Sequence, residues 1–200
     1  MKTSKNVKEE TKEKMIQSAM HIFAINGYNR ANIDDISLHA GYGKGTIYNY
    51  FSSKVELFLE VIKKFVNDLV CDINSKIQHI SDPIEKFKQL VHIDIEKINT
   101  QSDLFLTIMH ESLTADRDRQ SEFLNASSPL FRIYVQVIDE GIKAGCYKED
   151  TDAVSAAIML MGKIENLALI NKIFSNSLGS TEVLVEKITS SFIYGIKKRD

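Results

Sequence analysis

The 200-residue sequence is poor in proline and cysteine, and no run in it alternates apolar and polar residues. Proline occurs only at Pro83 and Pro129, so most of the chain is free of the residue that breaks helices. Half-buried strands need the alternation that is missing here. These absences predict an all-α fold. Apolar residues make up 44% of the chain, enough for a sizeable core in one or two compact domains.

The cysteines and histidines lack the spacing of metal sites. Cys71 and Cys146 predict free thiols in a reducing cytosol, in preference to a disulfide or a zinc site. The histidines show no paired i, i+4 spacing; they are His21, His39, His79, His92 and His110. We therefore expect neither a metal nor a cofactor.

Targeting and catalytic motifs are also missing. The N-terminal segment MKTSKNVKEETKEK has no apolar core and so does not resemble a signal peptide. Charges interrupt the longest apolar stretches well short of a membrane span. No Gly-rich phosphate loop, nucleophile elbow or cysteine–histidine motif occurs. The sequence predicts a soluble, cytoplasmic protein that is not an enzyme, and a helical enzyme is kept as a remote alternative.

Apolar residues recur at helical spacing along almost the whole chain. The first expected helix ends at Gly27, with Tyr28 placed to fold back on Phe23. Ser53 and Glu56 form a capping box that opens the fourth helix. About nine helices are expected in all, over residues 11–26, 32–40, 44–51, 53 to beyond 73, 83–100, 102 to beyond 113, 128–144, 151–174 and 181–197.

The C-terminal half carries three further expectations. Pro129 either opens or kinks its helix, and residues 116–118 form a solvated loop. The last two helices have a wider apolar surface than one neighbour can cover. Such a surface indicates either central burial or a second partner.

The charges are unevenly distributed along the chain, whose net charge is −2. Residues 1–54 hold eight Lys or Arg against five Asp or Glu, a net charge of +3, and the remainder carries −5. This asymmetry suits a head that binds DNA on an acidic body.

Residues 31–54, ANIDDISLHAGYGKGTIYNYFSSK, contain the most specific signals. Two short helices joined by a Gly-containing turn predict a helix-turn-helix, whose second helix reads the major groove. Within the second helix, Ile47 and Phe51 lie one turn apart and can anchor it inward, which turns Thr46 and Asn49 outward. Tyrosines on such a face are suited to phosphate and base contacts. The alternative is that Tyr48 and Tyr50 are core aromatics of an unrelated bundle.

This order of residues resembles the TetR family of bacterial transcriptional regulators. The likeness extends over residues 11–57 and is carried by Gly27-Tyr28, Ile33, Asp35-Ile36, Ala40-Gly41, Lys44-Gly45-Thr46, Tyr48, Phe51, Ser53-Lys54 and Leu57. The resemblance implies that Thr46 and Tyr50 reach bases, while Tyr48 and Lys54 hold the DNA backbone. It also implies a homodimer built on the last two helices and a ligand cavity in the body.

Three positions depart from the usual family pattern. Ala31-Asn32 replaces paired threonines, Tyr42 replaces a small aliphatic residue, and Gly43 replaces the Ser that often caps the reading helix. Gly at this cap costs a few tenths of a kcal/mol relative to Ser. Tyr42 is expected to add a DNA contact of its own.

The sequence therefore predicts a helix-turn-helix domain over residues 1–53 and a helical effector-binding and dimerisation domain over residues 54–200. The predicted DNA contacts are Asn32, Tyr42, Lys44, Gly45, Thr46, Tyr48, Asn49, Tyr50 and Lys54. The predicted dimer interface comprises Ala156, Ala157, Leu160, Ile164, Leu167, Val185, Ile188 and Phe192. The predicted ligand pocket comprises Phe65, Leu69, Phe105, Met109, His110, Leu113, Phe131, Tyr134, Met161 and Glu165. For each pocket residue, ordinary core packing is the competing interpretation.

The expected function is that of a homodimeric repressor, released from a palindromic operator when a small apolar ligand binds the body. A DNA-binding protein whose body recruits a protein partner, without a small-molecule effector, is the main alternative.

Overall fold

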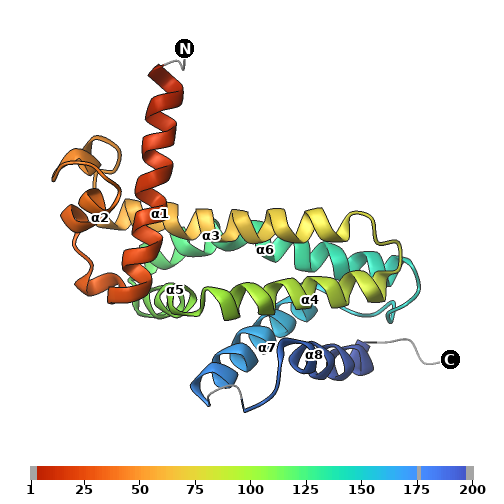
Figure 1. The fold of residues 1–200 in the computed structure, drawn as a ribbon. Helices are drawn as coiled ribbons and strands as arrows, with labels where there is room; N and C mark the ends of the chain where they lie inside the picture. The colour runs from red at the N-terminus through yellow and green to blue at the C-terminus, as the bar shows by residue number, and fades with distance from the viewer. Residues whose placement is uncertain (1–3, 175–176, 197–200) are drawn as a thin grey trace. The chain divides into compact units, whose positions relative to one another are not determined.

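The computed structural model describes residues 4–174 and 177–196, and in that part of the chain it confirms the all-α fold (Figure 1). Eight α-helices and one 3₁₀ helix account for the nine helical elements that the sequence predicts. They are α1 (Ser4–Arg30), α2 (Ile33–His39), η1 (Thr46–Asn49), α3 (Lys54–Ile77), α4 (Pro83–Thr100), α5 (Ser102–Thr114), α6 (Arg117–Lys143), α7 (Ala153–Ile173) and α8 (Thr181–Ile196).

The chain forms two compact units. One combines Met1–Phe65 with Asp103–Ser127, and the other combines Val66–Ser102 with Ser128–Asp200. The helix-turn-helix segment therefore belongs to the same unit as α5 and the first part of α6.

An aromatic cluster forms the core of the first unit. The Phe23 and Phe58 rings meet edge to face with centroids 5.2 Å apart, and Phe123 packs on Phe58 at 5.8 Å. Gly27 has a φ of 71°, and Tyr28 folds back so that its ring centroid lies 5.7 Å from that of Phe23. The backbone is non-helical at Gly27 inside the bounds of α1, so the helix that carries the apolar stripe ends there, as predicted, and a short second segment continues to Arg30.

The first helix is longer than its apolar pattern predicts, since α1 begins at Ser4 and not near Thr11. Residues 4–14 are rich in Lys and Glu, which favour helices without making an apolar stripe. The Thr11 hydroxyl donates to the carbonyl of Val7 at 2.9 Å, within this added segment. The apolar pattern marks where the helix becomes buried, not where it starts.

The start of α6 corrects the prediction of a loop at residues 116–118. The helix begins at Arg117, and the Asp116 carboxylate caps it by accepting from the backbone N–H of Arg119 at 3.0 Å. Pro129 lies inside the helix and does not open it. A proline there removes one backbone hydrogen bond, which the surrounding turns of α6 tolerate.

Helices α4, α7 and α8 pack together in the second unit. Phe87 of α4 stacks on Phe192 of α8 with ring centroids 5.3 Å apart, and Tyr147 approaches Phe87 edge-on. Asp82 caps α4 as predicted, with Pro83 in its first turn. These contacts place the apolar stripes of α4 and α8 in one core.

Candidate functional site

The segment expected to read DNA forms a 3₁₀ turn where the sequence predicts an α-helix over residues 44–51. In η1 the N–H of Tyr48 donates to the carbonyl of Gly45 at 3.1 Å, three residues back. Gly45 has a φ of 80°, which no α-helix contains. Gly43 precedes the turn and offers no side chain to cap a helix.

The inward positions of this segment are as predicted, and of the two residues expected to face outward Asn49 is exposed whereas Thr46 is half-buried. Ile47 is fully buried and Phe51 is 3% exposed, so both anchor the turn. Lys44 and Asn49 are exposed, and Tyr48 is 54% exposed. Tyr48 is therefore not a core aromatic, and its ring and hydroxyl are accessible to a ligand.

The other predicted contacts in this segment are less accessible. Gly45, Thr46 and Tyr50 are half-buried. Lys44, Gly45 and Thr46 nevertheless stand beside exposed Tyr48 along one continuous turn. The structure thus brings the predicted reading residues together on the head, and their contacts with DNA stay a prediction.

Asn32 and Tyr42 are both engaged within the first unit. The Asn32 side-chain oxygen accepts from the backbone N–H of Asp34 at 2.9 Å and so caps α2. The Tyr42 hydroxyl donates to the Thr11 hydroxyl at 3.2 Å. Asn32 therefore caps α2, and Tyr42 ties the segment before the reading turn to α1. Sequence spacing does not reveal the Tyr42–Thr11 bond.

The Lys54 ammonium lies over the Tyr28 ring, 4.6 Å from its centroid, and donates to the carbonyl of Asn29 at 3.2 Å. Burial lowers the pKa of Lys54, and the nearby Glu111 carboxylate partly offsets this effect. The cation predicted to meet a phosphate is therefore held against the end of α1. The sequence pattern did not reveal Tyr28 as its neighbour.

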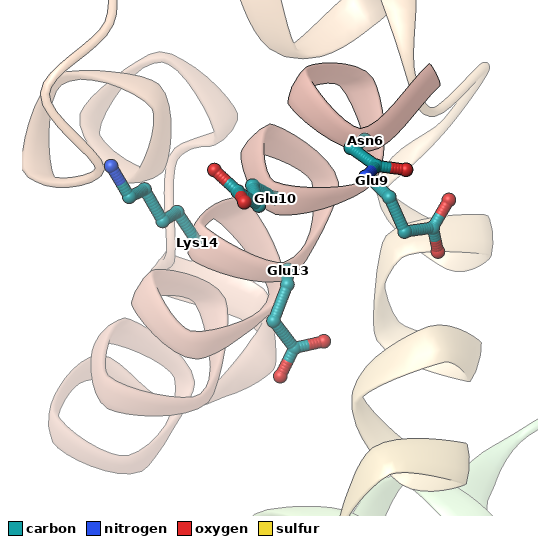
Figure 2. Close-up of a pocket in the computed structure, with 5 residues that line it drawn as sticks. All are labelled: Asn6, Glu9, Glu10, Glu13 and Lys14. Carbon is teal, nitrogen blue, oxygen red and sulfur yellow. The ribbon is translucent and has the colours of Figure 1, made fainter. Parts of the chain in front are cut away.

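The outer face of the first turns of α1 is acidic. These turns line a shallow hollow of about 600 Å³. Its lining residues, drawn in Figure 2, are Asn6, Glu9, Glu10, Glu13 and Lys14. Glu9 and Glu13 point away from Lys14 in this view. Because carboxylates repel phosphate, this face is poorly suited to DNA, and it accounts for much of the acid in the head.

The predicted pocket residues are divided between the two units. In the first unit Phe65 and Phe105 are buried and Met109 is half-buried. His110 is exposed and lines a hollow of about 200 Å³ with the end of α1. Leu113 is 73% exposed, so it does not line an enclosed cavity within this unit.

In the second unit the predicted pocket residues are more deeply placed. Leu69 and Tyr134 are buried, and Phe131, Met161 and Glu165 are half-buried. Among the described residues no group of three His, Cys, Asp or Glu side chains could hold a metal ion. The role of these side chains as ligand contacts stays a prediction.

The buried carboxyl of Asp94 lies close to two of these residues, Tyr134 and Glu165. The Tyr134 hydroxyl donates to the carboxylate of Asp94, which is 4% exposed. Burial raises the pKa of Asp94 to about 6, and burial together with the Asp94 charge raises the pKa of Glu165 to about 7. Asp94 is not among the site residues that the sequence predicts. Its position three residues after Val91 and four before Ile98, both buried, is the signal that could have found it.

The predicted dimer residues are largely covered by their own chain. Ala156, Ala157, Leu160, Ile164, Ile188 and Phe192 are buried within the single chain, and Leu167 and Val185 are half-buried. This part of the wide apolar surface lies in the core shared by α4, α7 and α8, and the role of these residues at a dimer interface stays a prediction. Other apolar side chains on α7 and its C-terminal cap remain exposed: Val154, Ile158, Met159, Ile170, Ile173 and Phe174.

Helix α7 is also long and apolar enough, by length and composition only, to cross a membrane. Its most apolar 18-residue window has a mean hydropathy of 1.6, and 28% of that window is buried. Lys163 and Glu165 interrupt the apolar run of α7. A search of the sequence for uninterrupted apolar stretches therefore does not identify this helix.

Two protein families match the chain. The family described as "Bacterial regulatory proteins, tetR family" matches residues 15–61, and "YsiA-like protein, C-terminal region" matches residues 61–188. The first match covers the helix-turn-helix segment, and the second covers more than half of the chain.

Similar curated proteins are regulators of transcription. The chain is 26% identical over 109 residues to the HTH-type transcriptional activator FasR of Mycolicibacterium smegmatis, covering 54% of the chain and only half of FasR. It is 22% identical over 151 residues to the fatty acid metabolism regulator protein of Bacillus subtilis, covering 76% of the chain and 78% of that protein.

The fold also matches solved structures. The transcriptional regulator FadR from Bacillus subtilis, in complex with stearoyl-CoA, has a TM-score of 0.83 to this structure. The match covers 92% of the chain and 98% of the FadR chain at 20% identity. At that identity the likeness shows the fold alone.

Proposed function

Because the chain belongs to the TetR family of bacterial transcriptional regulators, we propose that it acts as a homodimeric repressor whose operator is released when an apolar ligand binds the body. The expectations of a DNA-binding regulator that is not an enzyme are confirmed by this membership and by the regulators among its relatives. We expect it to work in the cytoplasm and without a cofactor.

The exposed reading turn supports the proposed DNA site. Lys44 and Asn49 are exposed beside Tyr48, and buried Ile47 fixes the turn from behind. A cation, an amide and a phenol suit phosphate and base edges. We place the reading head in residues 1–53 and the body in residues 54–200. Each subunit of a dimer would read one half-site of a palindrome, roughly 34–36 Å from the other.

A mobility-shift titration on the DNA directly upstream of the gene tests this site. Thr46→Ala removes a proposed base contact and should weaken specific binding by about tenfold, with little change on unrelated DNA. Thr114→Ala, at an exposed position on α5, is the matched control and should bind like the wild type. Equal affinities for all three proteins would remove Thr46 from the site. No specific retardation of the wild type at low salt would count against the operator proposal itself.

The exposed apolar side chains of α7 support the proposed homodimer. Ile158 and Met159 are 59% and 62% exposed on one part of the helix, and Ile173 and Phe174 are exposed at its end. Apolar patches of this kind on a soluble domain mark interaction surfaces. A second copy of the chain presents the same patch, as a two-fold interface requires.

The ligand proposal is supported by the FadR structure, whose stated ligand is stearoyl-CoA. A long acyl chain suits the buried and half-buried apolar side chains of the second unit, among them Leu69, Phe131 and Met161. Stearoyl-CoA added to the protein–operator complex should weaken binding by about 5–150-fold, the usual range of allosteric coupling. Coenzyme A alone is the control and should have no effect.

The same titration separates the competing forms of the proposal. A body that recruits a protein partner and has no small-molecule effector should show no change in affinity or thermal stability with stearoyl-CoA. FasR is named an activator, so the sign of regulation needs its own measurement. Transcription in vitro from the upstream promoter should fall when the protein is added, and a rise would replace repression by activation.

A further inference from the structure

Two neighbouring residues of α1 contact opposite ends of the reading turn, residues 44–50. Thr11 bonds to Tyr42, which precedes the turn, and Lys12 lies against Phe51, which follows it. Successive residues of an α-helix point about 100° apart, so two adjacent side chains can reach two different neighbours. All four residues belong to the first unit.

The contact with Tyr42 is a chain of two hydrogen bonds. The Tyr42 hydroxyl donates to the Thr11 hydroxyl at 3.2 Å, and the Thr11 hydroxyl donates to the carbonyl of Val7 at 2.9 Å. Because Thr11 gives its one proton to Val7, its oxygen is left to accept from Tyr42. Val7 lies in the part of α1 that precedes the predicted start of the helix, so this added part sets the direction of both bonds.

The bond to Thr11 leaves the Tyr42 hydroxyl unable to donate to a DNA phosphate. A phenol has one O–H, and phosphate oxygens accept hydrogen bonds from proteins. The proton that a phosphate needs is already given to Thr11. The small aliphatic residue that is usual in the family at this position has no hydroxyl and could not make this bond.

The segment before the reading turn is also fixed to α2. The N–H of Tyr42 donates to the carbonyl of Ser37 at 2.9 Å, and the Ser37 hydroxyl donates to the carbonyl of Gly43 at 2.8 Å. Ser37 is fully buried and Thr11 is 8% exposed. The entry of the turn is therefore held by buried groups from two helices, and Tyr42 supplies the side-chain bond to α1.

Lys12 makes the corresponding contact at the exit of the turn. Its ammonium lies 2.7 Å from the Glu60 carboxylate of α3 and 5.7 Å from the centroid of the Phe51 ring. A cation within about 6 Å of an aromatic ring is attracted to it. The Lys12 and Glu60 side chains are 34% and 21% exposed, so water covers this ion pair only in part. Lys12 thus joins α1 to the end of the reading turn and to α3.

We propose that Tyr42 is a positioning residue for DNA binding: it holds the entry of the reading turn on α1 through Thr11, while Lys12 holds the exit at Phe51. This inference rests on the proposed function, in which the reading turn meets DNA. The first helix fixes both ends of that surface, and Tyr42 acts without touching DNA.

A double-mutant cycle separates positioning from direct contact. Tyr42→Phe and Thr11→Val break the same hydrogen bond, so each should weaken binding roughly threefold to tenfold, and the double variant should bind no more weakly than either. The probe is a duplex selected by the wild-type protein from a random-sequence pool, titrated in a mobility-shift assay. Thr11→Ser keeps the hydroxyl and should bind like the wild type. So should the control Thr114→Val, whose exposed hydroxyl also donates to the carbonyl four residues back.

Three results of the cycle overturn the inference. Additive losses show that the two side chains act separately, as they do if Tyr42 contacts DNA itself. A loss confined to one of the two single variants has the same meaning. Unchanged affinity in both single variants shows that DNA binding does not need the bond.

Glu60→Gln tests the exit of the turn. Loss of an acid should by charge alone strengthen binding to DNA. Because Glu60 holds Lys12, the variant should instead bind roughly twofold to fivefold more weakly than Glu9→Gln, which removes an exposed acid from α1. Equal affinity of the two variants overturns the inference that α1 fixes both ends of the turn.

Amide exchange tests the hold on the turn without DNA. The N–H groups of Thr46 and Tyr48 donate to the carbonyls of Gly43 and Gly45, each at 3.1 Å. In the free protein their exchange, measured by NMR, should become faster in both single variants of the cycle and stay unchanged in the control. Unchanged exchange in the single variants overturns the inference. If the wild type selects no duplex, the proposed function fails, and faster exchange still supports the hold of α1 on the turn.

Discussion

Two carboxyls of the second unit, buried Asp94 and half-buried Glu165, make the stability of the protein depend on pH. Asp94 and Glu165 have pKa values of about 6 and about 7, raised from ordinary values of 3.8 and 4.5 mainly by burial. Each carboxyl therefore binds its proton more tightly in the folded chain than in the unfolded chain. The free energy of unfolding should fall as the pH rises from about 4 to about 7, and this contribution should level off above that range.

The magnitude follows from the shift of Asp94, the more deeply buried of the two. One pKa unit corresponds to about 1.4 kcal/mol, so the ionised Asp94 carboxylate destabilises the folded chain by roughly 3 kcal/mol near neutral pH. That is a large share of the stability of an ordinary domain. The hydroxyl of Tyr134, which donates to Asp94, opposes this effect and is already included in the raised value.

Asp94→Asn tests the reasoning. The amide oxygen can still accept from Tyr134, but the side chain cannot ionise. At about pH 8 the variant should be more stable than the wild type by up to roughly 3 kcal/mol, and at about pH 4 the two should be nearly equal. Urea unfolding of the ligand-free chain, at one fixed protein concentration, measures both values.

The control is Asp150→Asn, which changes an exposed carboxylate. It should leave the difference between the two pH values as in the wild type. The reasoning is refuted if Asp94→Asn is less stable than the wild type by the same amount at both pH values. In that case the charge of Asp94 does not destabilise the fold, and the loss comes from the altered contact with Tyr134.

Two further predictions concern packing. Ile158→Glu places a charge in the exposed apolar surface of α7 and should convert the dimer to a monomer, as measured by size exclusion with light scattering. The control Ile25→Glu, at an exposed position on the head, should leave the dimer intact. A stable wild-type monomer would contradict the proposed interface. Phe58→Ala removes the centre of the aromatic cluster and should lower the free energy of unfolding, measured by urea unfolding, by about 3–5 kcal/mol. The control Leu124→Ala, at a 72% exposed position, should change the free energy of unfolding little. Similar losses for both variants would contradict the role of the cluster in packing.

Much of the fold could be predicted from local patterns in the sequence. Gly27 ends the first helix, Asp82 caps α4 and Ile47 anchors the reading turn, each as its neighbours indicate. These features depend on side chains within a few residues of one another, so the sequence contains all that decides them. The same holds for the order of helices and for the helix-turn-helix, whose signals lie within residues 31–54.

Helix ends without an apolar pattern could not be placed in this way. The added turns at Ser4 and the start of α6 at Arg117 depend on polar residues that favour helix in one context and loop in another. The sequence also left open whether the wide apolar faces of the last helices meet a partner or the chain itself.

Only the tertiary structure decided which apolar and ionisable groups are buried. Leu160 and Ile188 are predicted interface residues, yet both are buried within the chain, where α7 and α8 pack with α4. Asp94 is an acidic residue that packing buries beside Tyr134. Burial is set by elements that are distant in sequence, and a periodic pattern identifies an apolar face without identifying its neighbour. The amino-acid sequence by itself determined that this protein is a helical regulator with a DNA-reading head. The packing of its helices determined which residues of the body are free to meet a partner and which carboxyls take up protons.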